Sequence, residues 1–233
     1  MAVLSELEPN KVFKYFEEIC SIPHGSRNLQ QISDYLVDFA KAHNLKCRQD
    51  DDLNVIIWKD GSKGYEDSEP VILQGHMDMV AVQEADCKKD MEKEGLDLEI
   101  NGDFISAKGT SLGGDDGIAV AYTLAVLDDE EMAHPPVEAI FTVNEEIGML
   151  GAASIDVSDL KGRLFMNMDS EDEGVFTVSC AGGASVICKI PYKRDLVNAP
   201  VIEIKLHGFT GGHSGVETVS YTHLRAHETD SYL

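Results

Sequence analysis

The chain has 233 residues, 43% of them hydrophobic, and its 42 acidic and 19 basic side chains give a formal charge of -23. This charge is typical of a well-solvated surface. It argues against nucleic acid and anionic membranes as partners, because both repel an acidic protein. The length allows one large domain, or one domain with part of another, and the apolar content is sufficient for a packed core.

The five cysteines are odd in number, widely spaced and without a Cys-x-x-Cys pair. This pattern predicts free thiols in a reducing compartment and argues against a zinc finger or a disulfide framework. The N-terminus shows no basic region followed by an apolar core, and no uncharged run approaches about 18 residues, so we expect neither a signal peptide nor a membrane span. The predicted location is the cytoplasm.

Helical and extended patterns alternate along the chain. Apolar residues at helical spacing predict amphipathic helices at 12–20 and 29–39, the second capped by Ser26 or Asn28. Segment 84–99 is charge-rich and is expected to be solvated. The predicted strands lie within 47–58, 71–80, 104–106, 137–143 and 164–168, and a buried helix is predicted at 118–127. This alternation predicts an α/β fold, a mostly parallel sheet flanked by helices.

The strand predicted at 71–80 carries His76 and Asp78 near its carboxyl end, which is where open α/β sheets bind their ligands. In an extended segment, side chains two residues apart lie on one face. A metal on that face can be bound by the imidazole while the carboxylate supports the site from outside. A single buried histidine is more often a core residue, so the interpretation depends on carboxylates further along the chain.

Those carboxylates are Asp115 in a Gly-rich loop, Glu145 and Glu146 after one strand, and Asp169 after another. Grouped at one sheet edge, they repel each other unless cations hold them. Imidazole with carboxylates suits zinc, or manganese or cobalt. A two-metal site needs a bridging carboxylate, and Asp115 is well suited because glycines let the backbone approach closely. Of the adjacent acids, one would bind metal and the other would act as a base.

Four motifs now carry a resemblance: LQGHMD at 73–78, GDDG at 114–117, NEEIG at 144–148 and NMDSE at 167–171. They occur in the order used by dizinc aminopeptidase-like exopeptidases. With SCAGG at 179–183 and GGHSG at 211–215, the chain most resembles the aminoacyl-histidine dipeptidase family, the bacterial carnosinase-type enzymes. The resemblance covers residues 1–217.

The resemblance implies two zinc ions, with cobalt or manganese as possible substitutes, and a role for each motif residue. His76 and Asp169 would bind the first zinc, and Asp78 would orient His76. Asp115 would bridge both ions, and Glu146 would bind the second. Asp116, often Asn in relatives, adds a charge beside the bridge.

The resemblance also implies catalysis. Glu145 would be the general base in the hydrolysis of Xaa-His and other dipeptides by zinc-activated water. His213, from a lid domain, would reach the substrate or its oxyanion, and the full-length protein would form a homodimer through that lid.

The implied organisation is a catalytic domain at 1–182, the start of an α+β lid and dimerisation domain at 183–217, and a tail at 218–233. The tail resembles the in-frame translation of a sequencing adaptor, so we expect it to be non-native and exclude His223 and His227 as ligands. The alternative is a native helix with histidines at i and i+4. In longer relatives a returning segment supplies a final histidine ligand, which is missing here, so we expect this fragment to be inactive.

Ser111 sits in a Gly-x-Ser-x-Gly pattern, but the helix is expected only after Asp116, which disfavours a nucleophile elbow. Segment 169–174 imitates the start of an EF-hand loop, but its twelfth position is Cys180. An amidohydrolase such as a deacetylase or aminoacylase is the alternative enzyme. A non-catalytic metal-binding module is disfavoured because it has no use for a free acid at Glu145.

Overall fold

The computed structural model describes residues 3–170 and 174–179, with isolated positions 187, 189, 191 and 193. Most of these belong to a compact unit, Met1–Cys180, and a second unit spans Ala181–Leu233. Apart from the isolated positions, the predicted lid and the tail lie outside the described residues. The elements are α1 (Asn10–Cys20), α2 (Gln30–Ala42), β1 (Lys46–Gln49), β2 (Val55–Lys59), β3 (Val71–His76), β4 (Leu98–Asn101), β5 (Phe104–Ala107), α3 (Gly114–Asp128), β6 (Val137–Thr142), α4 (Leu150–Ser154) and β7 (Leu164–Asn167).

Five strands form one sheet in the order β1-β2-β6-β3-β7, and β4 pairs with β5 in a separate hairpin. β3 pairs in parallel with both β6 and β7, whereas β1–β2 and β2–β6 are antiparallel. A short connection between β1 and β2 forces these two strands to run in opposite directions. The predicted α/β fold is therefore confirmed, and its sheet is mixed, with the parallel part at β6-β3-β7.

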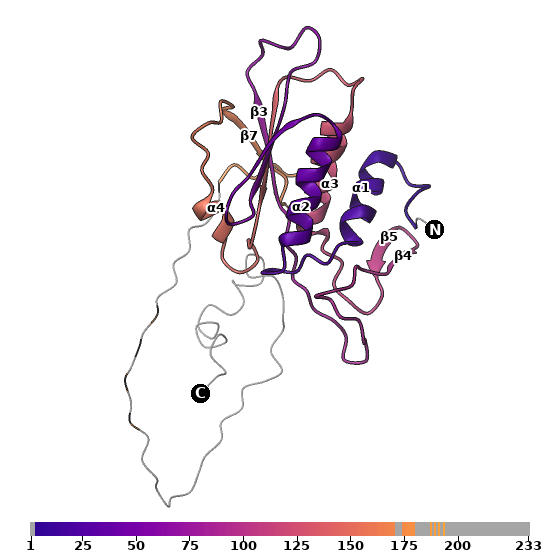
Figure 1. Ribbon diagram of the computed structural model, residues 1–233. Coiled ribbons are helices and arrows are strands. Elements are labelled where there is room, and N and C mark those ends of the chain that lie inside the picture. The colour runs from indigo at the N-terminus through magenta and orange to yellow at the C-terminus, as the bar shows by residue number, and fades with distance from the viewer. Residues whose placement is uncertain are drawn as a thin grey trace, which may run out of the picture. The chain divides into compact units, whose positions relative to one another are not determined.

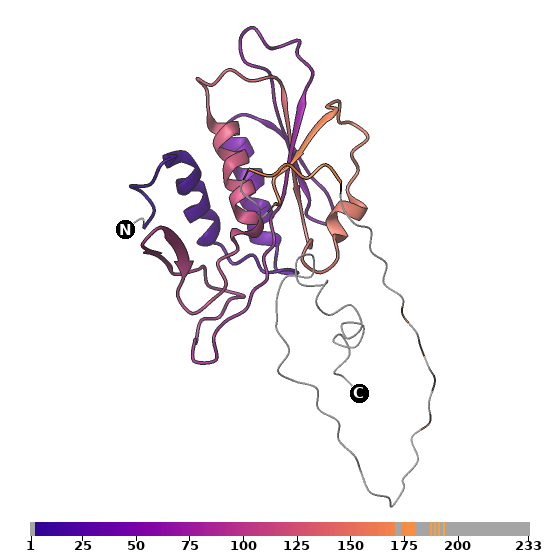
Figure 2. The same ribbon diagram turned by 180° about the vertical axis from the view of Figure 1, so that it is seen from behind.

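Three helices lie on one side of the sheet, and the short α4 lies on the other (Figure 1; Figure 2 shows the reverse view). α2 contacts β1 and β2, α3 contacts β3 and β6, and α1 packs on α3. α1 and α2 each bury one apolar face, as their spacing predicts. The segment of α3 after Asp116 is apolar all round, which agrees with its position between the sheet and α1.

Two details of the prediction are wrong. The N-cap of α2 is Leu29, with no side-chain cap bond, because Ser26 and Asn28 bond elsewhere, to Asp78 and to the Glu92 carbonyl. Segment 84–99 is solvated only in its first part, since Leu98 is buried and begins β4. The β4–β5 hairpin turns at Gly102, whose φ of +64° favours glycine.

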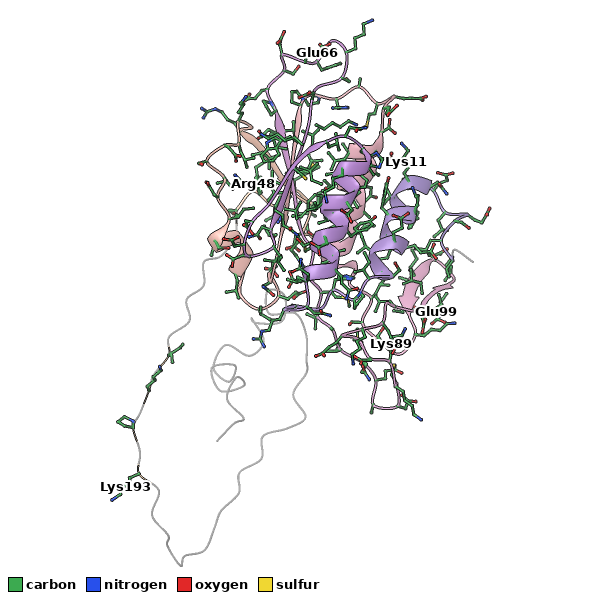
Figure 3. All side chains as sticks on the ribbon, viewed as in Figure 1. Lys11, Arg48, Glu66, Lys89, Glu99 and Lys193 are labelled. Carbon is green, nitrogen blue, oxygen red and sulfur yellow. The ribbon has the colours of Figure 1, made fainter. Side chains whose placement is uncertain are left out.

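Charged side chains such as those of Lys11 and Glu66 lie exposed on the described part of the chain (Figure 3). Arg48 on β1 lies 3.0 Å from Asp159, and Lys89, between β3 and β4, lies 3.1 Å from Asp97. The cysteines at 20, 47 and 87 are free, as predicted for these positions. Within the described part of the chain, no helix has the length and apolar character needed to cross a bilayer.

Candidate metal centre

Three parallel strands bring the predicted site residues to one edge of the sheet. β3 ends at His76, β6 ends at Thr142 just before the segment 143–146, and β7 ends two residues before Asp169. His76 pairs with Thr142, and Gln74 pairs with Asn167, so the carboxyl ends are level. This is the edge at which ligands bind in open α/β sheets.

His76, Asp115 and Glu146 form a cluster in which one ligand atom from each lies within 4.8 Å of the others. The His76 Nε2 atom is 3.0 Å from Asp115 Oδ1. The His76 side chain is 1% exposed, whereas that of Asp115 is 43% exposed, so the imidazole forms the floor and the carboxylate faces solvent. A ligand can therefore approach from the carboxylate side.

The His76 ring is oriented mainly by a backbone carbonyl. Its Nδ1 atom is 2.9 Å from the Asp78 carbonyl oxygen and 3.5 Å from the Asp78 carboxylate. An Nδ1–H that donates to this carbonyl leaves Nε2 directed at Asp115. Burial lowers the pKa of His76, but hydrogen bonds to the carboxylates of Asp115 and Asp78 outweigh it and raise the pKa to about 11. The carboxylates around the His76 ring thus favour a positive charge at this place.

The Asp78 carboxylate is fully buried and bonds away from the cluster as well. It accepts hydrogen bonds from the Glu145 backbone N–H at 3.0 Å and from the Ser26 hydroxyl at 2.8 Å. Burial raises the pKa of Asp78, but His76, the Glu145 N–H and Ser26 outweigh this and hold it below its usual range. Asp78 therefore contacts the backbone of the acid pair as well as the histidine.

The two adjacent glutamates are half-buried. Burial raises the pKa of both side chains, and the charges of Asp169 and Asp78 add to this effect at Glu145. A carboxylate with a raised pKa, beside a cluster that could hold a metal ion, has the properties that a general base requires.

Asp116 is buried, with 2% exposure. Its carboxylate accepts a hydrogen bond from the His76 backbone N–H at 3.1 Å. Burial is the main cause that raises its pKa, to about 8. Asp115 and Asp116 have non-helical backbone angles at the start of α3, and the peptide bond between them is cis. The regular helix begins after Asp116, as predicted.

Asp169 lies exposed at the end of β7 and lines a cavity of about 290 Å³ together with Asp115 and Asp116. Its charge raises the pKa of both Asp116 and Glu145, so it faces the same group of acids. Donors of this kind, one imidazole nitrogen and several carboxylate oxygens, fit a divalent cation such as zinc. His213 lies outside the described residues, and its role stays a prediction.

Ser111 is engaged by backbone. Its hydroxyl donates to the Val80 carbonyl at 2.6 Å and also accepts the Val82 N–H at 3.2 Å. This bonding ties the Gly-rich loop to the segment after β3, which agrees with a structural role.

Three polar residues that fix this site are not among the predicted site residues. The sequence pattern predicts Ser26 only as a helix cap, places Asn54 in a strand region and places Asn144 in a motif. Ser26 binds Asp78, Asn54 binds the Val143 N–H, and Asn144 accepts the Arg27 N–H at 2.8 Å. Each contact joins segments far apart in the chain. The sequence signal that could have found these residues is a polar residue next to a predicted apolar segment.

The mixed sheet, with a histidine and carboxylates at the ends of its parallel strands, has the fold of the dizinc aminopeptidase-like peptidases. No family model matches the chain. The chain is 38% identical over 219 residues to the cytosol non-specific dipeptidase of Escherichia coli, a match that covers 93% of this chain and 45% of that protein. The aminoacylhistidine dipeptidase structure from Vibrio alginolyticus matches with TM-score 0.71 and 39% identity, over 73% of this chain and 35% of that one.

These two matches confirm the resemblance to the aminoacyl-histidine dipeptidase family of metallopeptidases. An aminopeptidase structure from Bacillus cereus, at 20% identity and TM-score 0.60, covers 71% of this chain and 44% of that one, and it supports the fold alone. The chain spans less than half the length of each of these relatives.

Proposed function

We propose that this chain supplies the metal-binding side of a dipeptidase active site, which hydrolyses Xaa-His and other dipeptides with Glu145 as general base. The observation that carries this proposal is the cluster of His76, Asp115 and Glu146 at the carboxyl ends of parallel strands, with the half-buried Glu145 next to it. The names of the two relatives support the substrate class, since both are dipeptidases.

The metal would be zinc, with two ions in the complete site and cobalt or manganese as substitutes. His76 and Asp169 would hold one ion, Glu146 the other, and Asp115 would bridge them, while Asp78 supports His76. When bound, the ions polarise the peptide carbonyl and lower the pKa of water. Glu145 accepts a proton from the attacking water and returns it to the leaving amine, and burial of its carboxylate favours this exchange.

The remaining features of the proposal depend on the relatives. The Escherichia coli relative is named a cytosol enzyme, which supports a cytoplasmic location. The catalytic domain at 1–182, the lid at 183–217 with His213 directed at the substrate, and a homodimer formed through that lid follow from the family resemblance.

The test is Glu145→Gln in a full-length protein that contains this chain. The variant should lose at least about 100-fold in kcat on Xaa-His dipeptides, as expected for the loss of a general base, and should keep its metal content. The matched control is Glu130→Gln, because Glu130 is exposed and follows the C-terminal end of α3, whereas Asp115 lies at the start of that helix. Wild-type kcat in the Glu145 variant with full metal content would refute the role of Glu145. Parallel assays on N-acyl amino acids separate a dipeptidase from a deacetylase or aminoacylase.

A further inference from the structure

The connection between α1 and α2 lies against the segment that carries the metal centre. Ser26 donates its backbone N–H to the Met79 carbonyl at 3.1 Å, and Met79 donates to the His24 carbonyl at 3.2 Å. Arg27 donates its N–H to the Asn144 side chain at 2.8 Å. The short segment 24–27 is therefore bonded both to the end of β3 and to the segment that carries Glu145.

The Ser26 side chain completes this arrangement. Its hydroxyl donates to Asp78 Oδ2 at 2.8 Å, while the other oxygen, Oδ1, accepts the Glu145 N–H at 3.0 Å. Asp78 Oδ2 also lies 3.4 Å from the Glu146 N–H. Because the Asp78 side chain has no exposed surface, solvent does not replace the hydroxyl directly. A buried carboxylate that loses a hydrogen-bond donor either rotates to find another donor or keeps an unsatisfied oxygen, which lowers stability.

We propose that Ser26 is a positioning residue, whose hydroxyl fixes the Asp78 carboxylate in the rotamer that holds the backbone of Glu145 and Glu146 against the metal centre. Among the described residues, the Ser26 hydroxyl bonds to Asp78 and to neither glutamate side chain, so it acts through Asp78. The expected effect of Ser26 on metal binding rests on the proposed function. The positioning of the Glu145 backbone does not depend on a metal.

The first measurement is metal-free. In the 233-residue chain, Ser26→Ala should shift the Glu145 amide proton upfield and speed its hydrogen exchange about 10-fold, as expected for the loss of one hydrogen bond to a charged group. Ser26→Thr keeps the hydroxyl and should restore the wild-type amide. The backbone bond from Ser26 to Met79 is kept in both variants, so the segment itself stays in place.

The matched control is Ser33→Ala. The Ser33 hydroxyl, fully buried in α2, donates to the Leu53 carbonyl at 2.7 Å, away from the cluster. Its loss should lower stability and leave the Glu145 amide unchanged. An unchanged Glu145 amide in Ser26→Ala, or an equal change in Ser33→Ala, would overturn the proposal.

The second measurement uses cobalt as the probe. Ser26→Ala should weaken Co²⁺ binding about 10- to 100-fold and alter its absorption spectrum, as for other losses of support around metal ligands. Ser26→Thr should restore both. If the amide responds as expected but wild type and His76→Ala bind Co²⁺ equally weakly, the positioning role stands and the proposed metal centre is refuted. If wild type binds through His76 and Ser26→Ala binds equally well with an unchanged amide, the positioning role is refuted and the metal centre stands.

Discussion

The Asn54 side-chain oxygen accepts a hydrogen bond from the Val143 backbone N–H at 3.1 Å, across 89 residues of sequence. Asn54 is 1% exposed, and its amide also donates to Asp50 Oδ2 at 2.8 Å. Val143 follows β6 directly and precedes the segment that carries Glu145. The turn before β2 therefore anchors the strand end from which the acid pair projects.

Replacing this anchor should be costly. Asn54→Ala leaves the buried Val143 N–H without its partner, and we expect a loss of about 1–3 kcal/mol in the free energy of unfolding. Urea denaturation measures this difference. Gln30→Ala is the control, because its side-chain amide bonds to the exposed Asp34, and it should change stability by less than about 0.5 kcal/mol. Equal effects of the two substitutions would contradict the anchoring role.

At Gly75, on the strand that carries His76, there is no space for a larger side chain. A Cβ at this position would lie 2.8 Å from Asp116 Oδ2 and 2.9 Å from Ala119 Cβ. Gly75→Ala should therefore displace Asp116 from the His76 N–H and cost about 1–3 kcal/mol of stability, which thermal unfolding can measure.

Gly114→Ala is the matched control for this prediction. The nearest atom to its added Cβ is in Leu112, at 3.9 Å, so the substitution should be tolerated. A stable Gly75 variant would show that Asp116 is not held as closely as the structure indicates.

Much of the site was predictable because its residues follow apolar strands whose ends the pattern marks. His76, Glu146 and Asp169 each come at or just after such an end, and parallel pairing brings them together. The contact between Ser26 and Asp78 was not predictable, because it depends on how a loop 52 residues away folds over β3. β4 was missed since Leu98 is its single buried residue, and α4 is too short, at five residues, to show a helical period.

The exposed apolar side chains of β7 lead us to expect that the chain self-associates. Among the described strands it lies at the edge of the sheet, and Leu164, Phe165 and Met166 are 61%, 55% and 46% exposed. An exposed apolar edge strand favours pairing between copies. Phe165→Lys should raise the soluble fraction severalfold and reduce light scattering, with little change in thermal stability. Phe104→Lys, on the separate β4–β5 hairpin, removes one isolated apolar side chain and should have a smaller effect. Equal gains from both would assign the effect to charge alone.

The buried thiol of Cys20 leads us to expect that the folded chain loses stability at alkaline pH. Cys20 lies in α1 and is 1% exposed, and burial, with a smaller effect of the Glu17 charge, raises the pKa of its thiol from 9.0 to about 12. Between these values the unfolded chain releases the proton while the folded chain keeps it, so stability falls as pH rises. The contribution should reach about 2 kcal/mol by pH 10.5. Cys20→Ala removes the titrating group and, although less stable at pH 8, should lose less stability than wild type between pH 8 and 10.5. Urea midpoints over this range measure the two slopes. Parallel slopes would show that the Cys20 thiol ionises in the folded chain as readily as in the unfolded one.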